Sequence, residues 1–261
     1  MRLDSLVIGL SLGTTSLGYY YLGPQVAAAA AAVPLSLAII AWPNLMETYG
    51  REGATGMTPH LERYLRPVGL VVSPAVAALG VFGLGVLVTG FLPAFSPGLD
   101  AMQIWVLTAV FVQSIALLHQ ALVALRKVLL LIALTATAVL VQATILAVGS
   151  IDELSLTTAA WSAVAGQAML ALMLLVASAH QLGFRREDVA RLWGRIPVAW
   201  ASMIAIIVAI DRWAPEADGL LGALVLAAAE LVAFLALATL VLAVVDRQAL
   251  RDTRALLRGV G

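Results

Sequence analysis

Long runs of apolar residues divide the chain, and short polar segments separate them. A helix that crosses the hydrocarbon core of a bilayer needs roughly 20 apolar residues, because the core is about 30 Å thick and each residue adds about 1.5 Å. The apolar runs also lack the alternation of a transmembrane β-strand. The pattern therefore predicts an all-α polytopic membrane protein with eight spanning helices, over residues 3–21, 23–47, 64–91, 99–124, 127–149, 155–180, 195–211 and 218–246.

The composition supports a membrane protein and excludes other classes. Hydrophobic residues make up 62% of the chain and charged residues 11%, whereas about a quarter of an ordinary globular chain is charged. The absence of cysteine excludes a disulfide scaffold and thiolate metal sites. No basic patch interleaves with aromatic residues, so we expect the lipid bilayer as a partner and no nucleic acid.

The distribution of basic residues predicts an orientation. Of the 15 lysines and arginines, only Arg212 falls in an outer loop if the chain has eight helices and both termini are cytoplasmic. Such an excess of Lys and Arg marks the cytoplasmic side of a membrane protein. We also expect the tryptophans to form interfacial belts, with Trp105, Trp161 and Trp213 at the outer boundary and Trp42, Trp193 and Trp200 at the inner one.

The first two predicted helices carry polar stripes. At about 100° per residue, one stripe of the first helix contains Asp4, Ser11 and Thr15, and a second contains the Gly9–Gly13 pair of a GxxxG packing motif. The second helix presents small and polar residues along one face: Gln25, Ala29, Ala32, Ser36, Ile40, Pro43 and Glu47. Such faces suit either an aqueous path for a hydrophilic cargo or packing against a second protein half.

The candidate path residues are therefore Asp4, Ser11, Thr15, Gln25, Ser36 and Glu47. Two alternatives remain open for them. The hydroxyl groups can instead bond to the backbone of their own helix. Asp4 can cap a helix N-terminus at the membrane surface, where a carboxylate is favoured.

Two further ionisable residues fall inside predicted spans. Glu230 is either a functional carboxylate or a protonated side chain that is hydrogen-bonded to a neighbouring helix. For His119 we expect a structural histidine with a satisfied hydrogen bond, and no metal, because no ligand-type residue stands at metal-binding spacing beside it. No nucleophile elbow or phosphate loop appears, so the sequence supports neither an enzyme nor a cofactor.

The opening segment "LDSLVIGLSLGTTSLGYYYLGPQVA" resembles the start of the second lobe in the polysaccharide transporter (Wzx-like oligosaccharide flippase) family of the MOP superfamily. The segments "VPLSLAIIAWPNLMETYG", "FLPAFSPGLDAMQIWVL" and "ALVALRKVLLL" are similar to later parts of that lobe and follow in the same order. The resemblance covers roughly residues 3–180. Taken together, the order and spacing of these segments carry the resemblance.

The resemblance implies a six-helix lobe over residues 1–181, followed in 182–261 by a cytoplasmic basic loop, a terminal helix pair and a basic tail. It implies that lipid-linked oligosaccharide moves to the outer leaflet of the bacterial plasma membrane through a cavity between two lobes. Relative to that family the first lobe is missing, so we expect a fragment of a longer chain, a decayed gene, or a half that pairs with a partner half or a second copy. The alternatives are a non-transporting scaffold of a polysaccharide assembly complex and a multidrug exporter-like half.

Overall fold

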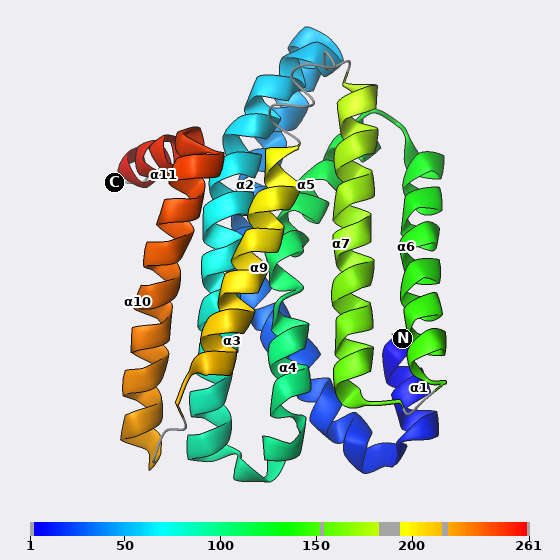
Figure 1. Cartoon of the computed structure of the whole chain (residues 1–261). Coiled ribbons are helices and arrows are strands. Elements are labelled where there is room, and N and C mark those ends of the chain that lie inside the picture. The colour runs from blue at the N-terminus through cyan, green and yellow to red at the C-terminus, as the bar shows by residue number, and fades with distance from the viewer. Residues whose placement is uncertain (1–2, 152–153, 183–193, 216–218, 260–261) are drawn as a thin grey trace.

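The computed structural model (Figure 1) describes residues 3–151, 154–182, 194–215 and 219–259, and every element within them is a helix. Six of the helical stretches are long and apolar enough to cross a membrane. The predicted all-α polytopic fold is therefore confirmed. The elements are α1 (Leu3–Ser11), α2 (Gly13–Pro67), the π-helix η1 (Val68–Val72), α3 (Ser73–Phe91), the 3₁₀ helix η2 (Pro93–Gly98), α4 (Leu99–Val106), α5 (Ala109–Ala124), α6 (Val128–Gly149), α7 (Leu156–Gln181), α9 (Arg195–Trp213), α10 (Gly219–Val245) and α11 (Arg247–Gly259).

Helix α2 consists of two arms that reverse direction at Gly53, which has non-helical dihedral angles (φ 71°, ψ −163°). The Asn44 amide donates a hydrogen bond to the Tyr64 hydroxyl at 3.4 Å, although the two residues are 20 positions apart. In a continuous helix they would be about 30 Å apart. Glycine tolerates this positive φ because it has no Cβ. The two arms contain the predicted spans 23–47 and the start of 64–91, and Figure 1 shows the reversal at the top.

The predicted first span, 3–21, is wrong because the helix breaks between Ser11 and Gly13. Gly13 adopts φ +85°, a left-handed conformation that side chains disfavour. Helix α1 has 9 residues and is only about 14 Å long, half of a bilayer core. The Gly9–Gly13 pair is therefore not a packing motif. Gly13 provides the positive φ at which the helix breaks. Gly9 lies close to the first turns of α2, since a Cβ there would be 3.2 Å from Leu17 Cδ2.

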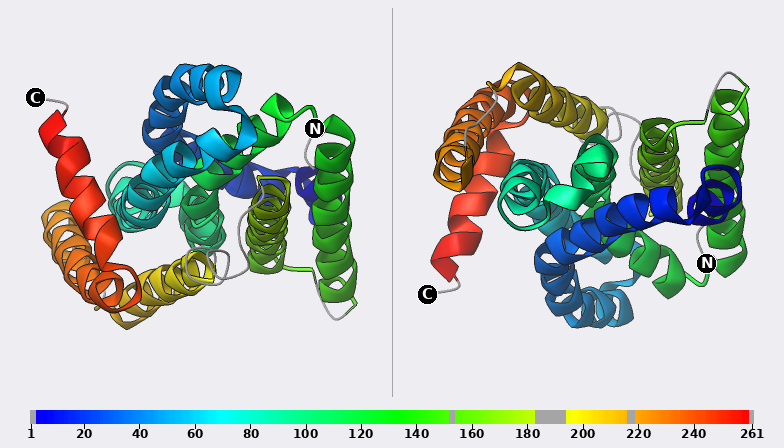
Figure 2. Two further views of the ribbon diagram at one scale, coloured as in Figure 1. Left: turned by 90° about the horizontal axis from the view of Figure 1, so that it is seen from above. Right: turned by 90° about the horizontal axis from the view of Figure 1, so that it is seen from below.

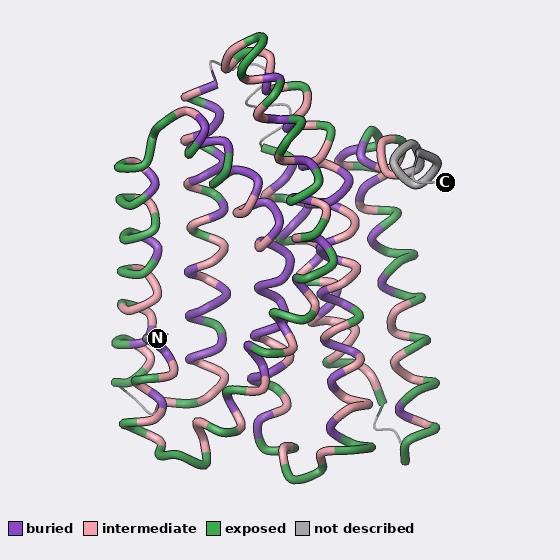
Figure 3. The backbone as a smooth tube through the Cα atoms, turned by 180° about the vertical axis from the view of Figure 1, so that it is seen from behind, coloured by how far each residue is buried: buried purple, intermediate pink, exposed green. Residues whose placement is uncertain are grey.

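Helices α3, α4 and α5 and the arms of α2 form the centre of the bundle, with α6 and α7 on one side and α9 and α10 on the other (Figures 1 and 2). The first turns of α2 cross the lower end of the bundle, as the right-hand view of Figure 2 shows. Buried residues concentrate on the central helices (Figure 3), whereas α6 and α10 expose aliphatic side chains such as Leu129, Leu140, Val232 and Val244. These exposed aliphatic faces are suited to lipid.

Basic residues gather at one end of the bundle. The upper end in Figure 1 holds the reversal of α2, the α5–α6 junction, the start of α9 and helix α11. The lysines and arginines of these segments are Arg51, Arg63, Arg66, Arg126, Lys127, Arg195, Arg247, Arg251, Arg254 and Arg258, whereas Arg212 lies near the opposite end of α9. Arg2, Arg185, Arg186 and Arg191 lie outside the described residues. This segregation agrees with the expected charge pattern, and the orientation relative to the cell stays a prediction.

The predicted tryptophan belts are only partly correct. Trp105 and Trp200 are buried, with 7% and 2% of their surface exposed. The Trp200 indole donates a hydrogen bond to the Gly69 carbonyl of η1 at 3.1 Å and meets the Phe111 ring edge-on, so it belongs to the core. Trp161 and Trp213 are exposed, as an interfacial belt requires. Trp193 lies outside the described residues.

Candidate functional site

A cavity of about 660 Å³ lies inside the bundle, between α1, α2, α4, α6 and α7 and the junction of α4 with α5. The alanine run of α2 forms one wall, since Ala27, Ala28 and Ala31 line it. Their small side chains leave open space where larger residues would fill it. The remaining walls bring together polar groups that are distant in sequence: Asp4, Thr108, Gln142 and Gln167.

Asp4 is the ionisable residue of this wall and is completely buried. The Tyr20 hydroxyl donates a hydrogen bond to its Oδ2 at 2.7 Å, and the Trp105 indole N–H in turn donates to the Tyr20 oxygen. The other carboxylate oxygen, Oδ1, has no hydrogen-bond partner. Buried polar atoms normally have a partner, so Oδ1 is an unsatisfied acceptor that surrounding atoms enclose at the cavity wall.

The break at Gly13 positions this carboxylate. Asp4 and Tyr20 are 16 residues apart and would be about 24 Å apart in a continuous helix. Folding α1 back on α2 brings them into contact. The predicted stripe of Asp4 with Ser11 and Thr15 is therefore not formed. Asp4 does lie in the first turn of α1, as the capping alternative expects, but its hydrogen bond comes from Tyr20 and not from a backbone N–H.

The remaining predicted path residues do not reach the cavity. Ser36 donates its hydroxyl hydrogen bond to the Val33 carbonyl of its own helix at 2.7 Å, and Glu47 forms an ion pair with Arg51. Only Asp4 of the predicted set lines the cavity, since Ser11, Thr15, Gln25, Ser36 and Glu47 are all exposed. The stripe of α2 is instead a continuous exposed face, which we call the α2 face: Gln25, Ala29, Ala32, Ser36, Ile40, Pro43 and Glu47.

Several cavity residues were missed by the sequence patterns. Gln142 and Gln167 stand alone in the apolar segments "VLVQATIL" and "AVAGQAML". A lone amide within a membrane helix is a usable signal, because it needs a polar partner or water there. Gly166 lets their helices approach closely, since a Cβ there would lie 3.2 Å from Gln142 Cβ. Tyr20 and Trp105 gave no comparable signal, because aromatic residues are common in both cores and interfaces.

The two other ionisable candidates are not part of this cavity. Glu230 is half-buried on α10 and lines a separate space of about 190 Å³ together with Gln103 and Asp211. Its carboxylate has no hydrogen bond to another described residue, so the second alternative, a bond to a neighbouring helix, is not formed within them. His119 is exposed beside an apolar groove between α5 and α6. It also lacks a hydrogen bond within the described chain, so the expectation of a satisfied structural histidine is wrong.

The cavity can accept a polar group through the amides of Gln142 and Gln167, with the unsatisfied Asp4 oxygen enclosed in the wall behind them. Among the residues that the structure describes, no group of three or more His, Asp or Glu side chains could hold a metal ion. Comparison with known proteins assigns no family to this arrangement. No family model, no curated protein and no solved structure matches the chain.

Proposed function

We propose that the chain is one half of a membrane translocator, which pairs with a partner half or a second copy and moves an amphiphile with a polar headgroup. The observation that carries the proposal is the fully buried Asp4, with one unpartnered carboxylate oxygen at a cavity within the helical bundle. An ionisable residue inside a membrane protein is costly and usually belongs to a substrate or ion pathway. By the resemblance, the cargo is a lipid-linked oligosaccharide and the membrane is the bacterial plasma membrane.

The size and chemistry of the cavity suit part of such a cargo. Its volume of about 660 Å³ lies within the usual range for small-molecule sites, roughly 300–1,000 Å³. Sugar hydroxyl groups can both donate hydrogen bonds to and accept them from the amides of Gln142 and Gln167. They would reach the enclosed Asp4 Oδ1 after a small shift of the cavity wall. The cavity would therefore hold a portion of the headgroup, while the lipid tail remains in the bilayer.

The α2 face supports the pairing. Its exposed amide, hydroxyl and carboxylate groups contrast with the aliphatic exposed faces of α6 and α10. Polar groups are costly against lipid, whereas small residues such as Ala29 and Ala32 let another helix approach closely. A partner half would cover this face. A scaffold would also use such a face but would not need the cavity beside Asp4.

Transport through the cavity is tested by replacing Asp4. The variant is expressed from a plasmid in a bacterium whose chromosomal copy of the gene is deleted, and surface polysaccharide is measured. We expect Asp4→Asn to reduce surface polysaccharide at least about tenfold, because loss of a charged hydrogen bond typically costs about 1.5 kcal/mol or more. The matched control is the double variant Ser11→Ala, Thr15→Val, which changes two exposed residues and should leave export unchanged. Unchanged polysaccharide in Asp4→Asn, at a normal protein level, would contradict transport through this cavity and favour the scaffold.

The pairing is tested by cross-linking, since the chain has no cysteine of its own. Ala32→Cys on the α2 face and Val232→Cys on α10 each introduce one exposed thiol. We expect a bifunctional maleimide to give a larger species on a denaturing gel with Ala32→Cys only. Equal cross-linking by both variants, or none by either at full labelling, would contradict pairing of two copies of this chain through the α2 face.

A further inference from the structure

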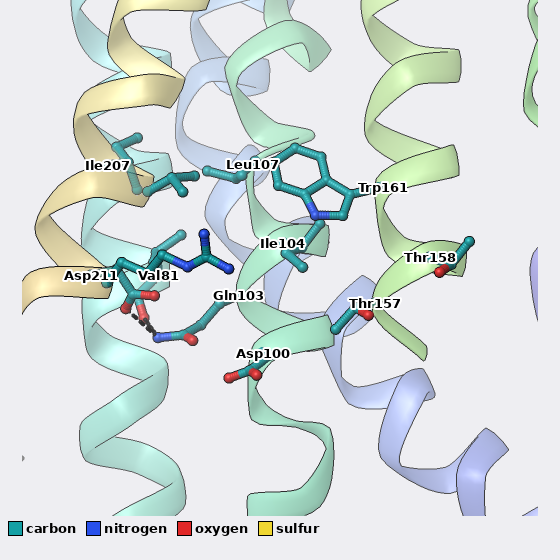
Figure 4. Close-up of a pocket in the computed structure, with 12 residues that line it drawn as sticks. Val81, Asp100, Gln103, Ile104, Leu107, Thr157, Thr158, Trp161, Ile207 and Asp211 are labelled. Carbon is teal, nitrogen blue, oxygen red and sulfur yellow. Dashed lines mark hydrogen bonds between the residues drawn. The ribbon is translucent and has the colours of Figure 1, made fainter. Parts of the chain in front are cut away.

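A second cavity, of about 600 Å³, opens between α3, α4, α7 and α9 (Figure 4), and it shares no lining residue with the cavity beside Asp4. It lies toward the end of the bundle opposite the basic segments, where α9 ends and α4 begins. Nothing in the proposed function uses this cavity. Its polar lining residues come from three helices: Asp100, Gln103, Thr157, Thr158, Asp211 and Arg212.

Gln103 is held in one orientation at the centre of this lining. Its Nε2 donates hydrogen bonds to Asp211 Oδ1 at 2.7 Å and to the Val81 carbonyl at 3.3 Å, and the dashed lines in Figure 4 mark such bonds. Both amide hydrogens are therefore in use. The Gln103 carbonyl oxygen accepts no hydrogen bond from another described residue and is free to accept one from a ligand.

The cavity is amphipathic along the helix axes. In Figure 4, Asp211, Gln103 and Asp100 lie in the lower part, and Ile207 and Leu107 lie above them. Asp211 is close to the end of α9 and Asp100 to the start of α4, where a membrane helix meets the headgroup region. The apolar residues lie about one to two turns deeper, since a turn rises about 5.4 Å. A ligand with a polar head and an apolar tail would match this order.

Charges of both signs surround the polar half. The Asp100 and Asp211 side chains both line this cavity, and a cationic group between two carboxylates would be attracted to both. The exposed Arg212 forms no ion pair with another described residue, so its guanidinium can bind an anion such as a phosphate. Trp161 adds an aromatic ring to the lining, and aromatic rings attract cations. The lining thus offers separate places for a cation and an anion.

We propose that this cavity binds the headgroup of a zwitterionic phospholipid that carries a primary amine, as an ethanolamine phospholipid does. The ammonium group lies between Asp100 and Asp211 and donates a hydrogen bond to the Gln103 carbonyl oxygen. The phosphate pairs with Arg212. The start of the acyl chains packs on Ile104 and Val208, which line the cavity and are half-buried, in the leaflet at the less basic end of the bundle.

The test uses the purified full chain in nanodiscs that contain ethanolamine, choline and glycerol phospholipids in equal amounts. Native mass spectrometry then identifies the lipids that stay bound after release from the disc. We expect ethanolamine lipid to be retained about tenfold over glycerol lipid, which has no ammonium group. Choline lipid should fall between them, because its quaternary ammonium cannot donate a hydrogen bond. Equal retention of all three would overturn the proposal.

Two variants locate the binding. Asp211→Asn and Asp100→Asn should each bring ethanolamine retention close to that of glycerol lipid, and Asp100 is exposed, so its replacement should not disturb folding. Glu52→Gln removes an exposed carboxylate at the reversal of α2, outside both cavities and outside the α2 face, and should leave lipid retention unchanged. If Asp100→Asn retains the lipid as the wild type does, the amine is not bound here.

Competition by soluble phosphoethanolamine would show that the headgroup alone is recognised. The readout is independent of transport, so its failure would leave the proposed function untouched.

Discussion

At the scale of single residues, Gly23 shows how the chain builds the surroundings of Asp4. A Cβ at this position would lie 2.9 Å from the Cα of Met102 and 3.1 Å from the Cβ of Trp105. Because the first of these is a backbone atom, rotation of a side chain cannot relieve the contact. The absence of a side chain at Gly23 therefore lets α2 cross α4 closely, and this crossing brings Trp105 to Tyr20 and Asp4.

We expect Gly23→Ala to lower the free energy of unfolding by about 1–3 kcal/mol, the usual cost of overpacking. Gly18 is the matched control, because it lies on the same helix and a Cβ there would meet nothing within 4 Å. Gly18→Ala should be neutral or stabilising by up to about 1 kcal/mol, since alanine favours helix. Unfolding of the purified variants in detergent measures both. Similar stability of the two would show that α2 and α4 can separate without cost.

At the scale of elements, the junction between α10 and α11 depends on Asp246. Its Oδ1 accepts hydrogen bonds from the backbone N–H groups of Gln248 and Ala249, at 3.1 and 3.3 Å, and so caps α11. Its Oδ2 lies 3.9 Å from Arg66 Nε on α2. Ala249, one turn into α11, is completely buried. The Asp246 carboxylate therefore caps the N-terminus of α11 and also contacts Arg66 of α2.

We expect Asp246→Ala to loosen α11, with a loss of about 1 kcal/mol for the cap alone. Asp246→Asn keeps a capping side chain and loses only the charge, so it should have a smaller effect. The measurement is the rate at which a thiol reagent modifies Ala249→Cys in the otherwise cysteine-free chain. Faster modification is expected with Asp246→Ala. An unchanged rate would mean that packing alone holds α11.

The sequence patterns located the long apolar helices because hydropathy and length determine them, and spans such as 127–149 and 195–211 lie within or close to α6 and α9. They did not detect the break at Gly13 or the pairing that it permits. A helical stripe assumes a continuous helix, whereas a positive φ at one glycine redirects every residue that precedes it. Asp4 was found because a carboxylate is unusual in an apolar run. Its partner Tyr20 depends on the tertiary fold, which periodicity does not encode.

At the scale of the whole molecule, the break at Gly13 changes the topology of the chain. Among the described residues, six helical stretches are long and apolar enough to cross a membrane. The first of them reverses at Gly53, so together they could provide seven passes. Helix α1 does not add a pass. It lies toward the lower end of the bundle in Figure 1, whereas α11 lies at the upper, basic end. The eight-helix prediction instead places both termini on the cytoplasmic side.

Single cysteines and a membrane-impermeant maleimide distinguish the two topologies in intact spheroplasts. Ser11 lies at the α1–α2 junction and is exposed, at the same end of the bundle as η2, which contains Ser96. We therefore expect both Ser11→Cys and Ser96→Cys to be labelled from outside. Arg126→Cys, at the basic end, should be labelled only after permeabilisation, because basic segments face the cytoplasm. The eight-helix pattern places Ser11 in mid-membrane, where the reagent does not reach. Protection of Ser11→Cys on both sides, with Ser96→Cys labelled, would therefore mean that residues 3–21 span the bilayer and that Asp4 lies at its surface.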